Sequence, residues 1–256
     1  MREGAPNMSI EQQDGKIIAN NYGHGGSGWT LAPGSSEYVY NLLNTSSYAK
    51  DLPKTTPVTI VGAGVIGLFT AYTLHQKGFQ NITIVAEKTT GLPSNNAAGL
   101  LAPVSMDNDP AIQKTIDEIG IEAYKLYDSI AKKKHPHFKK GAIAVPAYFR
   151  TREESGLEPY VEAKVMRPAK EVVLDFGNGT TQKMISYDDG IFIDTGELMQ
   201  ELTGYLKSKN VKFVQKKINS FTELKDKIIF NCTGLGSKEL NNDDKLGIST
   251  GSLDYA

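Results

Sequence analysis

The alternation of apolar and polar positions divides most of the chain into regular elements. The run "PVTIVGAG" from residue 57 predicts a short buried strand, and the following "VIGLFTAYTLHQKG" predicts a helix that stops at Gly78. A second apolar run, "NITIVAEK", predicts another strand. A strand, a helix and a strand within about thirty residues make up the parallel crossover unit of α/β proteins.

A long helix follows further along the chain. Apolar residues at Ile112, Ile116, Ile119, Ala123 and Leu126 have the spacing of one helix face. Just beyond this stretch, the basic run "KKKHPHFKK" is best interpreted as a solvated helix end, with an anion-binding or RNA-binding patch as the alternative.

The middle of the chain has a different pattern. Residues 141–193 contain four β-like runs, and "FGNGTT" between two of them predicts a hairpin turn because Asn178 and Gly179 tolerate positive φ. A helix capped by Asp194 or Thr195 then leads to the strands "VKFVQ" and "KIIFNCTG". Parallel α/β elements therefore bracket a β-rich insertion, which predicts an α/β cofactor domain that carries a second, β-rich domain.

Composition and charge narrow the classes of function. The 256 residues include 28 Lys and Arg against 29 Asp and Glu, a net charge of -1, so we expect neither a nucleic-acid nor an anionic-membrane partner. The apolar run 58–74 holds three glycines and is too short to span a membrane. Cys232 is the only cysteine, which excludes a disulfide framework and a multi-cysteine metal site, so no metal is predicted. The first fifteen residues are polar and lack the apolar core of a secretory signal, and a single cysteine suits a reducing compartment. Both observations favour a cytoplasmic protein.

Gly62, Gly64 and Gly67 form a G-x-G-x-x-G sequence between the first strand and its helix. Glycines at this spacing allow a tight turn, close approach of a pyrophosphate to the backbone, and helix packing on the strand. Glu87 ends the second strand about twenty residues after Gly67, where an acidic side chain binds a ribose hydroxyl. The sequence therefore predicts a dinucleotide site, the alternative being a glycine-rich turn in an ordinary α/β domain.

Several further stretches carry a family resemblance. They are "VTIVGAGVIGL", "ITIVAEK", "SNNAAGLLAP", "GIFIDTGELMQELTGYL", "VKFVQKKINSF", "IIFNCTGLGS" and, near the start of the chain, "NNYGHGGSGWTLAPGS". Together they resemble the FAD-dependent D-amino acid oxidase family, among the glycine-oxidase-like amine oxidoreductases. The resemblance implies a Rossmann-like FAD-binding domain (15–101 and 190–240), a partial β-rich substrate domain (102–189) and two tails (1–14 and 241–256). A nicotinamide-dependent dehydrogenase is a weaker alternative, since regular strand-helix repeats do not continue after the second strand.

The resemblance also implies which residues hold FAD. The pyrophosphate would lie against Gly62, Gly64, Val65, Ile66 and Gly67, and the adenosine ribose near Glu87 and Lys88. The flavin would lie beside Ser94, Ala98, Gly99, Leu100, Gly25, Gly26, Gly28, Trp29 and Thr30. Ile218 would contact adenine through its backbone, and Thr233 and Gly234 would end a strand against the cofactor.

The same resemblance implies the oxidation of an amino acid or amine, by hydride transfer to the flavin and with oxygen as the acceptor. The family's carboxylate-binding arginine precedes the "YGHGG" loop, at a place that would lie before Met1, and Arg2 and Gly25 are the substrate contacts that this sequence offers. His24 is expected to be structural. No other catalytic residue is identified.

The family motifs occur in a rotated order, and part of the substrate domain is missing from them. We therefore expect apolar surface on the remaining β-rich part, and with it a homo-oligomer or a complementing chain. The alternative to an active oxidase is a catalytically silent flavin-binding protein or fragment.

Overall fold

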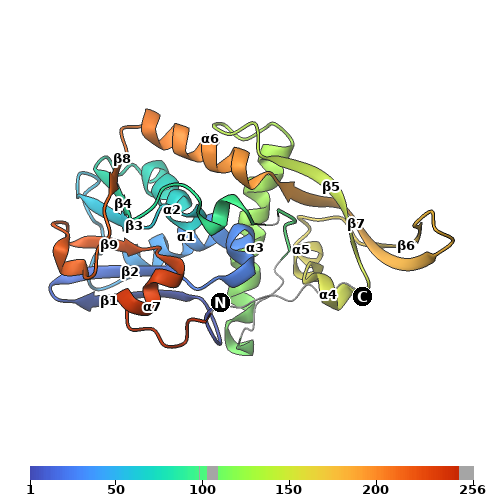
Figure 1. Ribbon diagram of the computed structural model, residues 1–256, viewed down its shortest axis with the longest axis horizontal. Coiled ribbons are helices and arrows are strands. Elements are labelled where there is room, and N and C mark those ends of the chain that lie inside the picture. Colours follow the sequence, from blue (N-terminus) through green and yellow to red (C-terminus); the bar gives the residue numbers. More distant parts are fainter. Residues whose placement is uncertain (98, 103–108, 248–256) are drawn as a thin grey trace.

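The computed structural model describes residues 1–97, 99–102 and 109–247 and contains two sheets (Figure 1). The larger sheet has six strands in the order β1-β2-β9-β3-β4-β8. All neighbours in it are parallel except β1 and β2, which form an antiparallel hairpin. Its strands are β1 (Asn7–Gln13), β2 (Lys16–Tyr22), β3 (Val58–Val61), β4 (Ile82–Ala86), β8 (Lys212–Gln215) and β9 (Ile228–Asn231). The predicted Rossmann-like sheet is confirmed.

Two long helices, α1 (Gly28–Thr45) and α2 (Val65–Gln76), lie against one face of this sheet, and a short segment covers the other. α3 (Pro110–Ala131) packs on α1 and α6 (Thr195–Ser208) packs on α2, and α7 (Ser237–Leu240) is a single short turn after β9. Alternate side chains of the strands, such as Ile60 and Val61, belong to different buried clusters, as expected for a sheet that is covered on both faces. On the second face, Ile218, Phe221 and Leu224 supply the cover.

Pro33 lies inside α1 and leaves one carbonyl without its helical partner. Proline has no N–H, so the oxygen of Trp29, four residues earlier, cannot accept the usual bond. The hydroxyl of Tyr127 in α3 donates to this oxygen at 2.7 Å. Gly34 permits the same close crossing, because a Cβ there would lie 2.0 Å from the oxygen of Ile119. The contact with α3 therefore fixes the first two turns of α1.

The smaller sheet is antiparallel, with the order β5-β7-β6, as predicted for the β-rich middle. It consists of β5 (Ala142–Phe149), β6 (Lys170–Asp175) and β7 (Thr181–Ile193), with α4 (Arg152–Ser155) and α5 (Glu158–Glu162) between β5 and β6. The β6-β7 hairpin projects from the body of the molecule (Figure 1). Its turn is confirmed, but the residues with positive φ are Gly177 and Gly179, whereas Asn178 instead accepts the N–H of Thr180.

Several large apolar side chains on this smaller sheet are exposed. Ile143 and Phe192, which pair across β5 and β7, are 54% and 43% exposed. Tyr148 and Val173 on the same sheet are 42% and 63% exposed. Surface of this kind marks a site that packs against another polypeptide or aggregates.

Both ends of the described chain depart from the predicted tails. Residues 7–13 form β1, the edge strand of the large sheet, although this stretch was expected to be a tail. Residues 243–247 are bonded to the first residues of the chain, with an isolated bridge between Arg2 and Leu246. The sequence "NMSIEQQ" has too few apolar residues to indicate a strand, because an edge strand needs only one buried side.

Candidate functional site

The predicted cofactor residues gather at the carboxyl edge of the large sheet. β2 leads into α1 and β3 leads into α2, and β9 lies between these two strands and parallel to both. The N-termini of α1 and α2 therefore begin on the same side of the sheet (Figure 1). Ligands of doubly wound α/β folds bind in the crevice outside this edge, where helix N-termini offer amide groups to anions.

The glycines around the start of α2 lie so close to neighbouring backbone atoms that a larger residue would clash. Gly62 has φ of +113°, and a Cβ there would lie 2.3 Å from the oxygen of Cys232. A Cβ on Gly67 would lie 2.0 Å from the oxygen of Gly62. The N-cap of α2 is Gly64, which has no side chain to bond the first-turn amides. The glycine loop therefore brings the start of α2 close to the ends of β3 and β9.

Ser94 joins the two helix starts. Its Oγ accepts the N–H of Val65 at 3.0 Å, and its carbonyl oxygen accepts the indole N–H of Trp29 at 3.0 Å. Thr30 donates its hydroxyl to the oxygen of Ala102 at 3.0 Å. The structure thus brings together three parts of the predicted flavin site that are far apart in the sequence: the glycine loop, the "PSNNAAGLLAP" stretch and the start of α1.

The "AAGLLAP" stretch passes close to the end of β7. Gly99 accepts the N–H of Ile193 at 2.8 Å, and a Cβ on Gly99 would lie 1.9 Å from the oxygen of Ile193. Leu100 pairs with Phe192 in an isolated bridge and is 41% exposed. The backbones of these two segments therefore pack closely. The predicted residue Ala98 lies outside the described residues.

The predicted adenosine residues lie at the ends of β4 and β8. Glu87 and Lys88 are exposed just after β4, and Gln215 donates its side-chain amide to the backbone oxygen of Glu87 at 3.3 Å. Ile218 is buried in the second hydrophobic cluster. The carboxylate of Glu87 is therefore open to a polar group from solvent, as a ribose contact requires.

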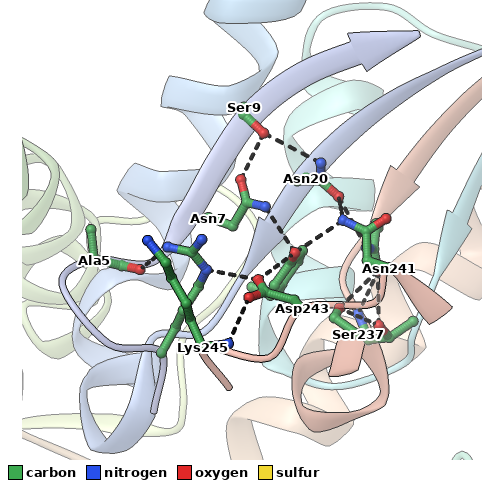
Figure 2. A network of polar contacts seen from close by, with 12 residues as sticks. Ala5, Asn7, Ser9, Asn20, Ser237, Asn241, Asp243 and Lys245 are labelled. Atoms are coloured by element: carbon green, nitrogen blue, oxygen red, sulfur yellow. Dashed lines mark hydrogen bonds and ion pairs between the residues drawn. The ribbon is translucent and has the colours of Figure 1, made fainter. Parts of the chain in front are cut away.

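Thr233 and Gly234 follow β9, and the Thr233 hydroxyl belongs to the polar network that includes Asn20 and Ser237 (Figure 2). The side-chain oxygen of Asn231 accepts the Thr233 hydroxyl at 2.8 Å and the Ser237 hydroxyl at 3.2 Å, and its nitrogen donates to Asn20 at 3.0 Å. Sequence reasoning missed Asn231 and Asn20. The signal available was an asparagine near the end of each of two adjacent strands, in "ANNY" and "FNCTG".

Arg2 lies in the neighbouring part of this network. Its Nε donates to Asp243 at 2.7 Å and its Nη1 to the oxygen of Ala5 at 3.0 Å (Figure 2). Tyr22 also donates to Asp243, at 2.9 Å. Arg2 and Tyr22 hold the pKa of Asp243 below its usual range, although partial burial opposes this shift. In this arrangement the guanidinium of Arg2 is used to tie the chain start to residue 243.

Two buried polar side chains precede α1. The amide atoms of Asn21 and the Nε2 atom of His24 are buried without a hydrogen-bond partner among the described residues. Burial lowers the pKa of His24 to about 4, so this ring is neutral near pH 7. Unsatisfied groups of this kind are rare and indicate a water or ligand. Their place in the predicted flavin-facing segment, together with the glycine loop at the start of α2, fits a polar aromatic cofactor that carries a pyrophosphate.

The part of the chain that is described contains no metal site and no reactive cysteine besides the predicted cofactor site. No group of three or more His, Cys, Asp and Glu side chains there could hold a metal ion. Cys232 is buried, and burial raises its thiol pKa to about 12, which keeps it protonated. Among the described residues, no helix has both the length and the apolar character needed to cross a lipid bilayer.

The fold and the edge site define a dinucleotide-binding α/β protein, and comparison with known families identifies which one. Residues 57–250 match the family model "FAD dependent oxidoreductase" (DAO), so the chain belongs to that family. FAD is therefore its cofactor class. The match begins just before β3 and does not include the β1, β2 and α1 segment, which contains the "YGHGG" loop.

Solved structures show the same fold at low identity. Amadoriase I (fructosyl amine:oxygen oxidoreductase) from Aspergillus fumigatus has a TM-score of 0.51 and 16% identity, and the match covers 74% of this chain and 51% of that one. Amadoriase II (fructosamine oxidase) from the same organism has a TM-score of 0.51 and 18% identity, with 74% and 51% covered. L-proline dehydrogenase from P. horikoshii has a TM-score of 0.52 and 14% identity, with 75% and 56% covered. This chain spans about half the length of these proteins.

Proposed function

We propose that this chain binds FAD at the carboxyl edge of its large sheet and oxidises the C–N bond of an amino acid or a similar amine. The observation that carries the proposal is the convergence of the glycine loop at the start of α2, the start of α1 and Ser94 at that edge. FAD, when bound, supplies the acceptor for a hydride from the substrate carbon next to nitrogen. We further propose that oxygen is the final acceptor and that the substrates are D-amino acids.

The residues of this chain would act on the cofactor and the substrate mainly by position and charge. The amides of Ile66 and Gly67 would hold the pyrophosphate, because the helix N-terminus carries unpaired N–H groups and a partial positive charge. The Val65 N–H already donates to Ser94, so Val65 would lie beside the pyrophosphate without donating to it. Glu87 would accept a ribose hydroxyl. Gly25, Gly26 and Gly28, with Trp29 and Thr30, would line the ring, where the start of α1 stabilises negative charge.

One observation favours the silent flavin-binding protein as a second candidate. A substrate carboxylate is best held by a bidentate arginine, but Arg2 is already paired with Asp243 at 2.7 Å. For Arg2 to bind substrate, this ion pair would have to break. The exposed pair Ile143 and Phe192 supports a related proposal, that a second copy or a complementing chain covers the small sheet and completes the substrate side.

The visible spectrum of the purified chain after incubation with FAD tests these alternatives. We expect a yellow protein that keeps its flavin through gel filtration, and bleaching on addition of D-amino acids without oxygen. A yellow protein that no amino acid or amine in a panel bleaches would establish the silent flavoprotein. A colourless protein that does not take up FAD would contradict both the active oxidase and the silent flavin-binding protein.

We also propose that the family order is rotated in this chain, so that β1, β2 and α1 correspond to the end of the usual sequence. The contacts between Met1 and the last described residue support this: the Met1 amino group donates to the oxygen of Gly247 at 2.7 Å, and the Gly247 N–H donates to the oxygen of Met1 at 2.9 Å. Segments from opposite parts of the sequence that lie side by side are compatible with circular permutation.

A permuted chain tests this proposal. Ala256 is joined to Met1, and new ends are opened between Asp51 and Leu52, in the connection between α1 and β3. We expect the same FAD affinity and a melting temperature within about 5 °C of the original, since the permutation breaks no strand or helix. A control opened inside β3 should not fold. Loss of the fold in the first permutant would show that the present order is required.

A further inference from the structure

Three of the four histidines form an aromatic cluster on the far side of α2 from the cofactor edge. Tyr72 and His75 come from α2, Tyr205 comes from α6, and His135, His137 and Phe138 come from the segment after α3. Ring centroids of neighbouring members lie 4.7 to 6.4 Å apart, and Gln76 donates to the Tyr205 hydroxyl at 2.8 Å. We call these six rings the histidine cluster.

His135 is the buried histidine of this cluster, and it organises the segment. It is 6% exposed, and its ring stacks on Phe138 with centroids 4.8 Å apart and planes 6° from parallel. Its Nδ1 accepts the backbone N–H groups of Phe138 at 3.0 Å and of His137 at 3.3 Å. Because Nδ1 accepts two bonds, the proton of the neutral ring is assigned to Nε2, which lies 3.4 Å from the Tyr72 hydroxyl.

The charged side chains around the His135 ring are lysines, which carry positive charge. Within its own segment, Lys139 donates to the His135 backbone oxygen and Lys133 to the Lys139 oxygen. Lys209 faces the cluster from the end of α6, where it lies over the Tyr205 ring. The other titratable groups that face the cluster are Tyr72 and His75 from α2, Tyr205 from α6, and His137. A proton on His135 therefore adds positive charge beside positive charge.

We propose that His135 is an acid-sensitive latch, which holds the 132–141 segment against α2 and α6 when neutral and releases it when Nδ1 is protonated. A proton on Nδ1 would point at the two backbone N–H groups from which Nδ1 now accepts hydrogen bonds. Both hydrogen bonds would therefore be lost together. The far end of the segment is tied to α6 by the Gly141 N–H, which bonds Glu197 at 3.1 Å. The start of α6 in turn bonds the loop after Ser94, through Thr195 and the oxygen of Asn95 at 3.4 Å.

The direction of the pH dependence follows from the two states. Burial, with smaller contributions from His137 and Lys139, lowers the pKa of His135 to about 4. An unfolded or released histidine has a pKa near 6.5. The released state therefore binds more protons, so the latch is fully closed above about pH 6.5 and opens as the pH falls toward about 4.

Hydrogen exchange of peptides that cover 132–141 and 195–208 tests the latch, with rates corrected for the intrinsic effect of pH. Between about pH 7.5 and about pH 5 we expect protection in the wild-type protein to fall roughly tenfold. His135→Asn should lose no protection over this range, because the asparagine oxygen can accept both N–H groups and does not titrate. His137→Asn, at an exposed position, should behave like the wild type.

Equal loss of protection in wild type and His135→Asn would assign the effect to other groups and overturn the proposal. NMR titration of the wild-type protein gives a second measurement that does not depend on the folding of a variant. Four histidine resonances are expected, and the His135 and His24 signals should both titrate well below those of His75 and His137. A His135 pKa near 6.5 would also overturn the latch. Neither measurement requires FAD, so the outcome is independent of the proposed function.

Discussion

Gly67→Ala is expected to lower FAD affinity by roughly 100-fold, about 2.7 kcal/mol of binding free energy. The added methyl group would lie 2.0 Å from the oxygen of Gly62, well inside contact distance. Relief requires a shift of α2 away from the glycine loop, which moves the amides of Ile66 and residue 67 from the place of the pyrophosphate. Quenching of flavin fluorescence on titration of the apoprotein measures the change.

A matched substitution separates this effect from the general cost of adding a methyl group to a helix. Gly204 lies in α6, and a Cβ there would meet nothing within 4 Å. Gly204→Ala should leave FAD affinity unchanged and stabilise the protein by up to about 1 kcal/mol through helix propensity. If Gly67→Ala binds FAD as tightly as the wild type, the glycine loop is not the pyrophosphate site.

Local patterns predicted the elements that carry the glycine loop. Apolar runs and a glycine stop within thirty residues predicted β3, α2 and β4. Asp194 predicted the cap of α6, and its side chain accepts the N–H of Glu197 at 2.8 Å. The hairpin after β6 also follows from its glycines. These features depend on contacts between residues that are close in the sequence, and a local sequence pattern can predict such contacts.

Contacts between distant segments could not be predicted in the same way. The bonds of Ser94 to Val65 and Trp29 link residues 29 and 65 positions apart, and the same hydroxyl could cap its own loop in isolation. The family resemblance placed these residues near one cofactor but not in contact. The edge strand β1 was missed because its polar sequence is stabilised by pairing with β2 rather than by burial.

The register of β2 beside β9 depends on a buried polar pair that no local pattern indicates. Asn20 and Asn231 face each other across these parallel strands and are both fully buried. A buried amide stabilises a single register only if every bond is made, because each unsatisfied group costs about 1–3 kcal/mol. This pair therefore fixes how the 7–22 hairpin, which lies outside the matched family region, joins the rest of the sheet.

Asn231→Ala is accordingly expected to destabilise the protein by roughly 3 kcal/mol. It removes the bond to Asn20 at 3.0 Å and leaves the hydroxyls of Thr233 and Ser237 without their common acceptor. Urea unfolding should show a lower midpoint with an unchanged slope. Asn219→Ala, at an exposed position, is the control and should cost less than about 0.5 kcal/mol.

Proteolysis shows where the stability is lost. The turn between β1 and β2 contains Asp14 and Gly15, and it becomes cleavable when β2 separates from β9. In Asn231→Ala we expect cleavage at this turn before cleavage elsewhere, with little change in Asn219→Ala. Uniform cleavage along the chain, or a midpoint equal to that of the wild type, would mean that backbone pairing alone holds the hairpin in place.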